Sequence, residues 1–177
     1  MANPTYSLIT SVATTSNTIT FSSIPQIYSD LVIKYSVAEG QGGGGYGQGD
    51  FQLTLNSDSA TNYSETRFAG GNGTSVYTSR RTSVAYTLFM TYNGNTSTAN
   101  TFGNGEIYIP NYTSTTAKQL FNFDVTEDSN SSNPNIVDTD AQLYRGTSAI
   151  TSITLTDTNG QGLASGTRLY LYGIKNS

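Results

Sequence analysis

Apolar and polar residues alternate along most of the chain, which is the period-two pattern of β-strands. The clearest case is residues 30–39, DLVIKYSVAE, in which the odd-numbered residues from Leu31 to Val37 line one face while Lys34 and Ser36 line the other. No segment keeps the 3.6-residue period of a helix for more than a turn or two. The pattern therefore predicts an all-β chain of roughly nine or ten strands without a substantial helix.

The same alternation marks the other expected strands. Residues 6–8 and 19–21 are expected to lie on the two strands of a first hairpin. Residues 51–57, FQLTLNS, are expected to pair with residues 62–68, NYSETRF, across a short polar turn. The remaining strands are expected within residues 84–92, 101–110, 118–127, 141–145, 149–156 and 167–174.

Two of these segments have a distinctive distribution of apolar residues. In residues 118–127, KQLFNFDVTE, the apolar residues Phe121, Phe123 and Val125 share one side. Residues 84–92, VAYTLFMTY, carry apolar residues on both faces. Because a strand covered on both faces lies inside a sheet, we expect residues 84–92 to form a central strand.

Two segments interrupt the alternation. Residues 40–49, GQGGGGYGQG, contain too many glycines for a strand or a helix, so we expect an exposed loop there. Residues 127–135, EDSNSSNPN, are polar and carry an Asn-Pro turn signal, which predicts a surface loop. Turn signals recur about every 8–15 residues, which favours an antiparallel sandwich or barrel. Residues 1–177 are expected to form a single β-sandwich domain of jelly-roll type.

The composition agrees with a β-rich fold. Thr, Ser and Asn supply 28, 22 and 16 residues, or 66 of 177, and only 11% of the residues are charged. An average globular domain has about 25% charged residues, and helix surfaces use many of them. The 13 Tyr and 7 Phe exceed what a disordered chain carries. We therefore expect a folded protein built from sheets.

The residue types that are missing exclude many kinds of chemistry. The chain has no His, no Cys and no Trp. Without His and Cys, the usual zinc sites, the Ser-His-Asp and Cys-His nucleophiles, thiol redox centres and disulfides are excluded. We expect no catalytic residue, no cofactor and no enzymatic activity.

Charge and hydropathy bear on the possible partners. The net charge of −4 and only eight Lys and Arg residues provide no footprint for a phosphate backbone, so nucleic acid is not an expected partner. No apolar run approaches the ~18–20 residues that span a bilayer, so a membrane is not an expected partner either. The N-terminal residues lack the basic and apolar regions of a signal peptide, and we expect none.

Acidic residues supply the main candidates for metal binding. The densest cluster comprises Asp124, Glu127, Asp128, Asp138 and Asp140, and carboxylate oxygens are ligands that calcium prefers. Nothing in the sequence matches the EF-hand spacing, so no dedicated metal site is predicted. Two interpretations stay open, a weak calcium site at an interface and carboxylates solvated in loops.

Two enzyme-like patterns are weak. Residues 40–49 contain a formal GxGxxG match, but a strand follows it, whereas a dinucleotide site needs a helix N-terminus there. Glu65, Glu106 and Asp124 lie in or near expected strands and meet the minimal glycosidase requirement for two carboxylates, which almost any sequence meets. Neither pattern predicts an active site.

Tyrosine and arginine provide the candidate contact residues. A tyrosine ring can stack on a partner or a sugar while its hydroxyl forms a hydrogen bond, so exposed tyrosines suit interfaces. Arg80 and Arg81 occur in the polar segment TSRRTS, expected to be a turn that either increases solubility or contacts an acidic partner. The candidate partner or glycan contacts, with the tyrosines expected in loops, are Tyr46, Tyr63, Tyr77, Tyr112, Arg80 and Arg81.

Three segments together resemble a known family. They are ITFSSIPQIYSDLVIKYS at residues 19–36, STANTFGNGEIYIPNYTSTTAKQ at residues 97–119 and AITSITLTDTNGQGLASGTRLYLYGI at residues 149–174. The IPxxYxDL turn, the EIYIPNYTS strand and the terminal LYGI are distinctive as a set. The chain resembles small β-rich virion structural proteins of tailed bacteriophages, particularly aquatic ones. The likeness is weakest in the Gly-rich loop and in residues 127–140.

The resemblance implies a non-enzymatic component of a phage particle, assembled in the host cytoplasm and located in the virion. The leading hypothesis is a capsid decoration or cement-type protein, a homo-oligomer bound to the major capsid protein on the outer face of the head. The alternative is a tail-fibre or baseplate module that recognises host-surface glycan through loop tyrosines and asparagines. A third hypothesis, a polysaccharide-degrading enzyme, predicts cleavage of host capsule. The lack of Cys suits assembly in a reducing cytoplasm.

Overall fold

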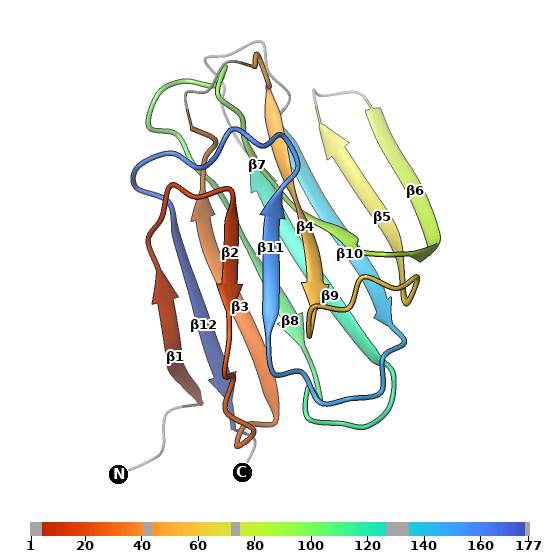
Figure 1. Cartoon of the computed structure of the whole chain (residues 1–177). Helices are drawn as coiled ribbons and strands as arrows, with labels where there is room; N and C mark the ends of the chain where they lie inside the picture. Colours follow the sequence, from red (N-terminus) through yellow and green to blue (C-terminus); the bar gives the residue numbers. More distant parts are fainter. Residues whose placement is uncertain (1–4, 41–43, 72–74, 127–134, 176–177) are drawn as a thin grey trace.

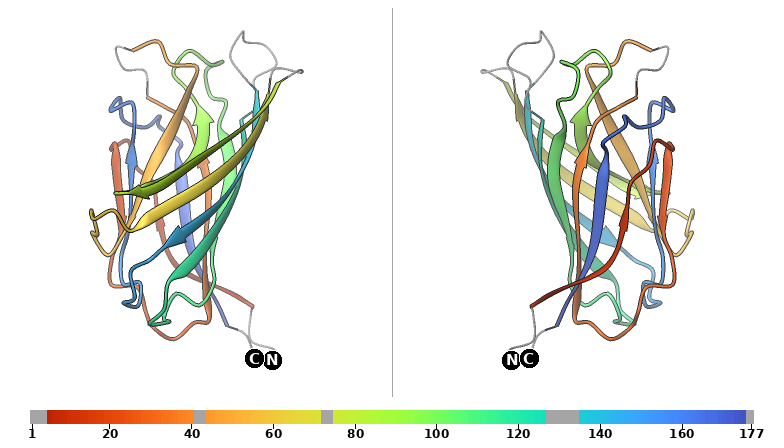
Figure 2. Two further views of the ribbon diagram at one scale, coloured as in Figure 1. Left: turned by 90° about the vertical axis from the view of Figure 1, so that its right-hand side faces the viewer. Right: turned by 90° about the vertical axis from the view of Figure 1, so that its left-hand side faces the viewer.

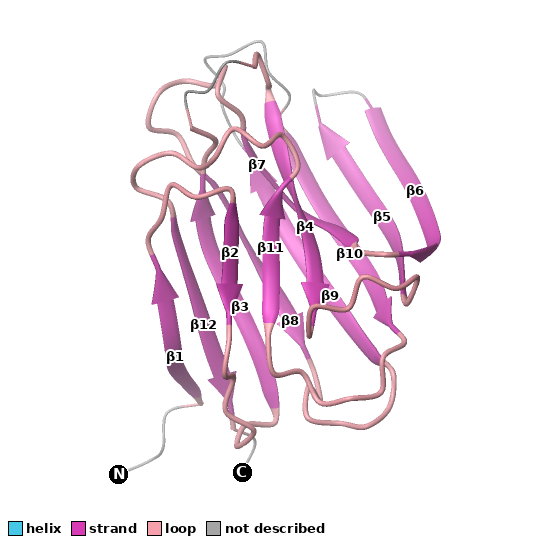
Figure 3. Cartoon of the chain, in the orientation of Figure 1, coloured by secondary structure: helices cyan, strands magenta, loops and turns pink. Residues whose placement is uncertain are grey.

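The computed structural model describes residues 5–40, 44–71, 75–126 and 135–175, and these residues form twelve strands and no helix (Figures 1 and 3). The strands make two antiparallel sheets that pack face to face. The prediction of an all-β chain with a sandwich-like arrangement is confirmed, although the structure has more than the nine or ten strands expected from the sequence.

One sheet is twice as wide as the other. The large sheet contains, in spatial order, β1 (Tyr6–Val12), β12 (Arg168–Ile174), β3 (Asp30–Val37), β8 (Gly103–Ile109), β9 (Lys118–Thr126), β10 (Ile136–Tyr144), β5 (Tyr63–Gly71) and β6 (Ser75–Val84). The small sheet contains β2 (Thr18–Phe21), β11 (Ile153–Asp157), β4 (Gln48–Leu55) and β7 (Thr87–Asn93). Figure 2 shows the two sheets edge-on as separate layers, with β5 and β6 running obliquely at one side.

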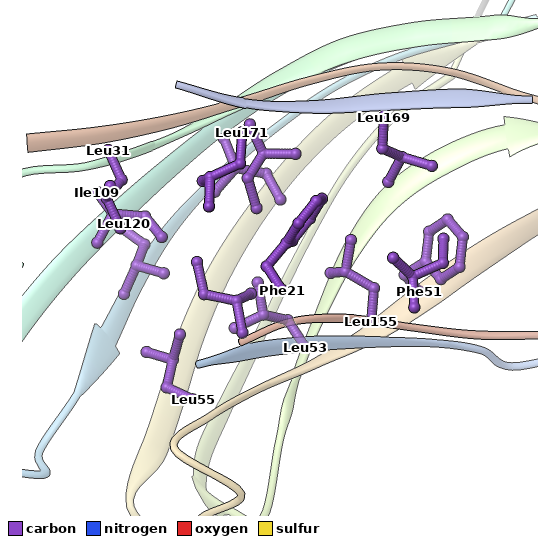
Figure 4. Close-up of a cluster of buried hydrophobic side chains, with 14 of the residues drawn as sticks. Phe21, Leu31, Phe51, Leu53, Leu55, Ile109, Leu120, Leu155, Leu169 and Leu171 are labelled. Atoms are coloured by element: carbon purple, nitrogen blue, oxygen red, sulfur yellow. The ribbon is translucent and has the colours of Figure 1, made fainter. Parts of the chain in front are cut away.

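Aliphatic and aromatic side chains fill the space between the small sheet and strands β12, β3 and β8. Phe21, Leu53 and Leu155 of the small sheet point toward Leu169 and Leu171 of the large sheet, and all five are buried (Figure 4). Their strands alternate apolar and polar residues, so each contributes one apolar face to this core. Full burial of each such side chain stabilises the fold by about 1.5–3 kcal/mol.

Polar side chains fill the rest of the interior. The inner faces of β9, β10 and β5 carry Asn122, Asp124, Asp138, Asp140, Gln142, Glu65 and Arg67, all buried. Strand β7 lies over them. The amide of Leu88 donates to Glu65 at 2.8 Å, the Leu88 carbonyl accepts from Gln142 at 3.3 Å, and Thr91 Oγ1 donates to Asp138 at 3.2 Å. The sandwich therefore has an apolar half and a polar half.

Two expected strand pairings are wrong. Strands β1 and β2 do not form a hairpin, because β1 pairs with β12 in the large sheet and β2 pairs with β11 in the small one. Strand β4 pairs with β11 and β7, while β5 pairs with β10 and β6. Both connections pass from one sheet to the other. Crossing between the sheets places successive strands in the two facing layers of the sandwich.

Two local expectations also fail. The segment TSRRTS is part of β6 and not a turn, because its backbone completes a ladder with β5. Residues 84–92 do not form one central strand. Strand β6 of the large sheet ends at Val84, and β7 begins at Thr87 as the edge strand of the small sheet. The apolar residues of this segment are therefore divided between two layers.

The expected loops are only partly described. Strand β4 begins at Gln48, and the ring of Tyr92 fills the space beside buried Gly49 where a side chain would lie, so the end of the Gly-rich segment belongs to a sheet. Residues 41–43 of that segment, and residues 127–134 of the expected polar loop, lie outside the described residues.

Candidate functional site

The outer face of the large sheet carries exposed apolar side chains on strands β5, β9 and β10. Phe68 of β5, Phe121 and Phe123 of β9 and Val137 of β10 are each between 46% and 53% exposed. They alternate along their strands with the buried polar residues of the inner face. Because successive side chains of a strand point to opposite faces, a polar inner face places these apolar residues in contact with solvent.

The strand register makes these residues neighbours. Thr139 of β10 pairs with Phe123 on one side and with Phe68 on the other. Val137 occupies the next outward position on β10, and Phe121 the next on β9. We call Phe68, Phe121, Phe123 and Val137 the outer-face patch. Contiguous exposed apolar residues on a soluble protein mark interaction sites more often than scattered ones do.

Aromatic residues continue along this face toward β1. Tyr108 of β8 pairs with Phe121, and farther along Tyr6 and Tyr172 form an edge-to-face pair with ring centroids 6.1 Å apart. The hydroxyl of Tyr108 donates to Asp30 Oδ2 at 2.8 Å. Burial of the hydroxyl and this bond to a carboxylate raise the pKa of Tyr108 to about 12, so it remains a neutral donor at physiological pH.

The charges on the outer face include one ion pair. Lys34 Nζ of β3 lies 3.0 Å from Glu106 Oε2 of β8, and both side chains are nearly half exposed. The hydrogen bond to Glu106 raises the pKa of Lys34. Paired charges contribute little to a docking surface, because each already has a partner and solvent screens both.

An open groove of about 410 Å³ lies on the outer face and shares Phe121 with the outer-face patch. Its lining combines aromatic rings with polar side chains, and its residues come mainly from β8, β9, β10, β5 and β6. The lining residues include Tyr108, Phe121, Gln119, Thr66, Arg80 and Leu143. This combination of ring faces and hydrogen-bonding groups is able to hold a polar ligand such as a sugar or a peptide.

The structure separates the two expected arginine contacts. Arg80 is exposed on the outer face and lines the groove. Arg81 lies on the inner face, where its Nε donates to Glu65 Oε1 at 2.7 Å and its Nη2 donates to the Tyr86 carbonyl at 3.1 Å. Arg81 is therefore a structural partner of Glu65, and only Arg80 is placed to meet another molecule.

Two of the expected loop tyrosines are buried in the core, so the expectation of surface exposure is wrong for them. Tyr63 begins β5, stacks on Tyr144 with ring centroids 4.9 Å apart, and donates its hydroxyl to the Asp58 carbonyl at 3.0 Å. Tyr112 is fully buried, and its hydroxyl donates to the Pro25 carbonyl. Both rings fill the apolar core while backbone groups satisfy their hydroxyls, which a local sequence pattern does not reveal.

Tyr46 and Tyr77 are exposed, but they lie apart. Tyr46 is 38% exposed in the loop before β4, where its amide donates to Asn95 Oδ1 at 2.9 Å. Tyr77 is 43% exposed on β6, not in a loop, and the Arg67 guanidinium lies 5.9 Å from its ring centroid. Partial burial raises the pKa of Tyr77. The six predicted contact residues do not gather into one site.

The acidic candidates also occupy unexpected places. Asp124, Asp138 and Asp140 are buried on β9 and β10, so the interpretation as carboxylates solvated in loops is wrong for these three. Glu127 and Asp128 lie outside the described residues. Glu106 points to the outer face, whereas Glu65 and Asp124 point inward, so Glu106 does not form a carboxylate pair with either.

The residues of the outer-face patch were not among the predicted contacts. The sequence does show Phe121 and Phe123 on one face of a strand. Because Asn122 and Asp124 alternate with them, the sequence does not say which of the two faces is exposed to solvent. An alternating strand identifies two faces without saying which one another layer covers.

Comparison with known proteins finds no matching family model, no matching curated protein and no matching solved structure. Among the described residues, no helix is long and apolar enough to cross a membrane.

Proposed function

We propose that this chain is a non-enzymatic structural component of a bacteriophage virion, a capsid decoration protein that binds the shell through its outer-face patch. The observation that carries the proposal is the exposure of Phe68, Phe121, Phe123 and Val137 together on one face of the large sheet. Apolar contact between proteins depends little on salt, which suits a particle that passes from cytoplasm to open water. The resemblance of the sequence to phage virion proteins supports the same assignment.

We also propose a jelly-roll classification for the core of the fold. Without β5, β6, β9 and β10, the sheet orders are β1-β12-β3-β8 and β2-β11-β4-β7. The chain then crosses between sheets at nearly every connection, as the eight strands of a jelly roll do. Viral capsid and lectin domains use this arrangement, which supports a virion role by analogy of fold. The four additional strands carry the outer-face patch.

The decisive experiment locates the chain on particles. Purified virions that contain the chain are analysed by quantitative mass spectrometry for copy number and by cryo-electron microscopy for position. The proposal expects many copies, arranged with the symmetry of the head and with β9 and β10 facing the shell. A few copies confined to the tail would contradict it.

A binding experiment tests the outer-face patch itself. Phe121→Thr combined with Phe123→Thr removes two exposed rings but keeps residues with strand propensity. Capsid shells that lack the chain are expected to bind much less of this double variant than of the wild-type chain. Ile27→Thr is the matched control, because Ile27 is an exposed aliphatic residue in a loop away from the patch. Equal binding of the double variant and the control would reject the patch as the contact surface.

A second candidate function, a tail module that binds host-surface glycan, is favoured by the groove of Tyr108, Phe121 and Arg80. A glycan array with the purified chain distinguishes it from decoration. If a glycan binds in the groove, Arg80→Ala weakens the signal while Tyr46→Ala, at the other exposed site, leaves it unchanged. The decoration proposal expects no glycan signal, and neither proposal expects cleavage of host capsule.

A further inference from the structure

Three buried carboxylates converge inside the polar half of the sandwich. One oxygen from each of Asp124, Asp138 and Asp140 lies within 4.8 Å of the other two. Each residue is at most 1% exposed. Carboxylates so close together repel one another, and burial deprives them of water, so such a cluster is costly unless a positive charge joins it.

The register of β9 and β10 brings these residues together. Asp124 and Asp138 are directly opposite each other across the two strands. Asp140 is two residues farther along β10 and therefore points to the same face. The convergence follows from the sheet itself, which is a rigid platform for ligands.

The cations of the polar half are engaged elsewhere or shared. Arg67 forms ion pairs with Asp138 and, at 3.5 Å, with Asp50. Arg81 pairs with Glu65. Neither oxygen of Asp140, nor Oδ1 of Asp138, accepts a hydrogen bond of normal geometry from any described residue. A buried carboxylate oxygen without a donor is an unusual and costly arrangement.

A separate polar group points to the same place. The hydroxyl of Tyr35, on β3, is buried and forms no hydrogen bond with any described residue. It lies against Gly105 of β8, where Asp124 Oδ1 also lies, and a Cβ at position 105 would collide with both oxygens. Gly105 pairs with Tyr35 on one side and with Asp124 on the other. The missing side chain thus leaves space for a fourth oxygen beside the carboxylates.

We propose that Asp124, Asp138 and Asp140 bind a calcium ion, with the Tyr35 hydroxyl beside it. Calcium takes oxygen ligands at about 2.3–2.6 Å, so oxygens bound to one ion can lie up to about 5 Å apart, and the three carboxylate oxygens, all within 4.8 Å of one another, are close enough to share one ion. Magnesium usually keeps several of its waters, whereas these three carboxylates are buried inside the sandwich, which favours calcium. Calcium would add positive charge to a cluster in which Arg67 is already shared between Asp138 and Asp50.

Because the cluster is buried, calcium binding is tested during refolding. Because the ligands are inside the sandwich, the ion enters as the chain folds. The full chain is unfolded in urea with chelator and refolded with either calcium or chelator. The proposal expects one tightly held calcium per chain by elemental analysis and a midpoint of thermal unfolding higher by about 5 °C or more with calcium. No retained calcium and an unchanged midpoint would overturn it.

Variants connect the effect to these residues. Asp140→Asn is expected to abolish both the retained calcium and the thermal shift, and it is expected to fold because an amide of nearly the same shape replaces the buried carboxyl group. Asp157→Asn is the matched control. Asp157 is also buried, but it accepts hydrogen bonds from Tyr92 at 2.5 Å and from the amide of Asn159 at 3.0 Å. The Asp157→Asn variant is therefore expected to retain calcium and to show the same thermal shift as the wild type. A calcium shift that survives in Asp140→Asn would place the ion elsewhere and reject the site.

Terbium luminescence detects a bound ion near a tyrosine ring, and a change in stability alone does not alter it. Terbium replaces calcium at oxygen sites and emits when a nearby aromatic ring transfers energy to it. The chain has no Trp, so tyrosine is the sensitiser. The wild type refolded with terbium is expected to show sensitised emission, and Tyr35→Phe to show several-fold less while it remains folded. Undiminished emission in Tyr35→Phe would exclude Tyr35 from the site.

Discussion

The apolar and polar halves of this sandwich are built from the same kind of strand but are stabilised differently. Between the small sheet and β12, β3 and β8, buried Leu, Ile and Phe side chains pack without directional requirements. Between β7 and strands β9, β10 and β5, buried carboxylates, amides and guanidinium groups must each find a partner. The outer faces are inverted as well, since the apolar outer-face patch covers the polar half. A period-two strand supplies one apolar and one polar face, and either one can be buried.

The largest expected effect comes from breaking the polar half at Arg67. Arg67 is buried and forms ion pairs with Asp138 and Asp50, so Arg67→Met leaves two carboxylates without it. We expect a loss of about 3–5 kcal/mol in the free energy of unfolding, measured by urea denaturation in chelator. Adding Asp138→Asn to Arg67→Met should recover part of the loss. The exposed Arg168 serves as control, and Arg168→Met should change stability by less than about 0.5 kcal/mol.

The apolar half is tested at Leu155, which is fully buried on β11. Leu155→Ala should lower the free energy of unfolding by about 2–5 kcal/mol, because it removes buried methyl groups and leaves a cavity. Thr154→Ala, on the same strand but facing outward, should cost much less. Asp138→Asn is expected to recover part of the stability lost in Arg67→Met. No second substitution of that kind exists for Leu155→Ala, because no charge loses its partner. A loss below about 1 kcal/mol would mean that the apolar half is not tightly packed.

The stability of the polar half is expected to depend on pH through Asp140. Burial and then the charge of Asp138 raise the pKa of Asp140 from its ordinary 3.8 to about 8. The folded chain therefore holds a proton that the unfolded chain releases, and the stabilising contribution present below about pH 4 is lost as the pH rises toward 8. The charged groups that face Asp140, or lie near it on the strands packed around it, are Asp138, Asp124, Glu65, Arg67 and Asp50.

Asp140→Asn removes this titration and isolates it. In chelator, the stability of the variant relative to the wild type should increase with pH, by no more than about 1.4 kcal/mol per pH unit. Urea denaturation at several pH values between 4 and 8 measures the difference. A constant difference across that range would show that Asp140 does not retain its proton.

The smallest effect is expected on the outer face of the apolar half, at the exposed pair of Lys34 and Glu106. Lys34→Ala should cost about 0.2–1 kcal/mol, because solvent screens the charges and both side chains lose freedom on pairing. A double-mutant cycle with Glu106→Gln, measured at low and high salt, checks the coupling. A coupling energy as large as that between Arg67 and Asp138 would contradict the expectation that exposed ion pairs stabilise this fold less than buried ones.

Several strands were predictable because their alternation is local and strong. Strands β3, β4, β8, β11 and β12 lie close to the segments identified from the sequence. Strand β6 was missed because its middle, TSRRTS, has no apolar residue, and its stability as a strand comes from pairing with β5. The pairing of β1 with β12 joins the two ends of the described chain, and no local pattern encodes it.

The candidate site was less predictable than the strands. Tyr63 and Tyr112 looked like loop residues, yet both rings fill the core. Phe121 and Phe123 formed a recognisable stripe, yet they face solvent because the other side of β9 is covered by β7. Asp124 and Asp138 are 14 positions apart in the sequence and become direct neighbours only through the register of β9 and β10.

By itself, the sequence determined which segments are extended, that helices are absent from the expected fold and which chemistries lack the residues they need. These properties follow from side-chain type and spacing within a few residues. Only the tertiary structure decided which face of each strand is buried, which strands pair and where the charges meet. The reason is that a strand satisfies its backbone and covers one of its faces through partners distant in sequence, and here those partners buried carboxylates and exposed aromatic rings.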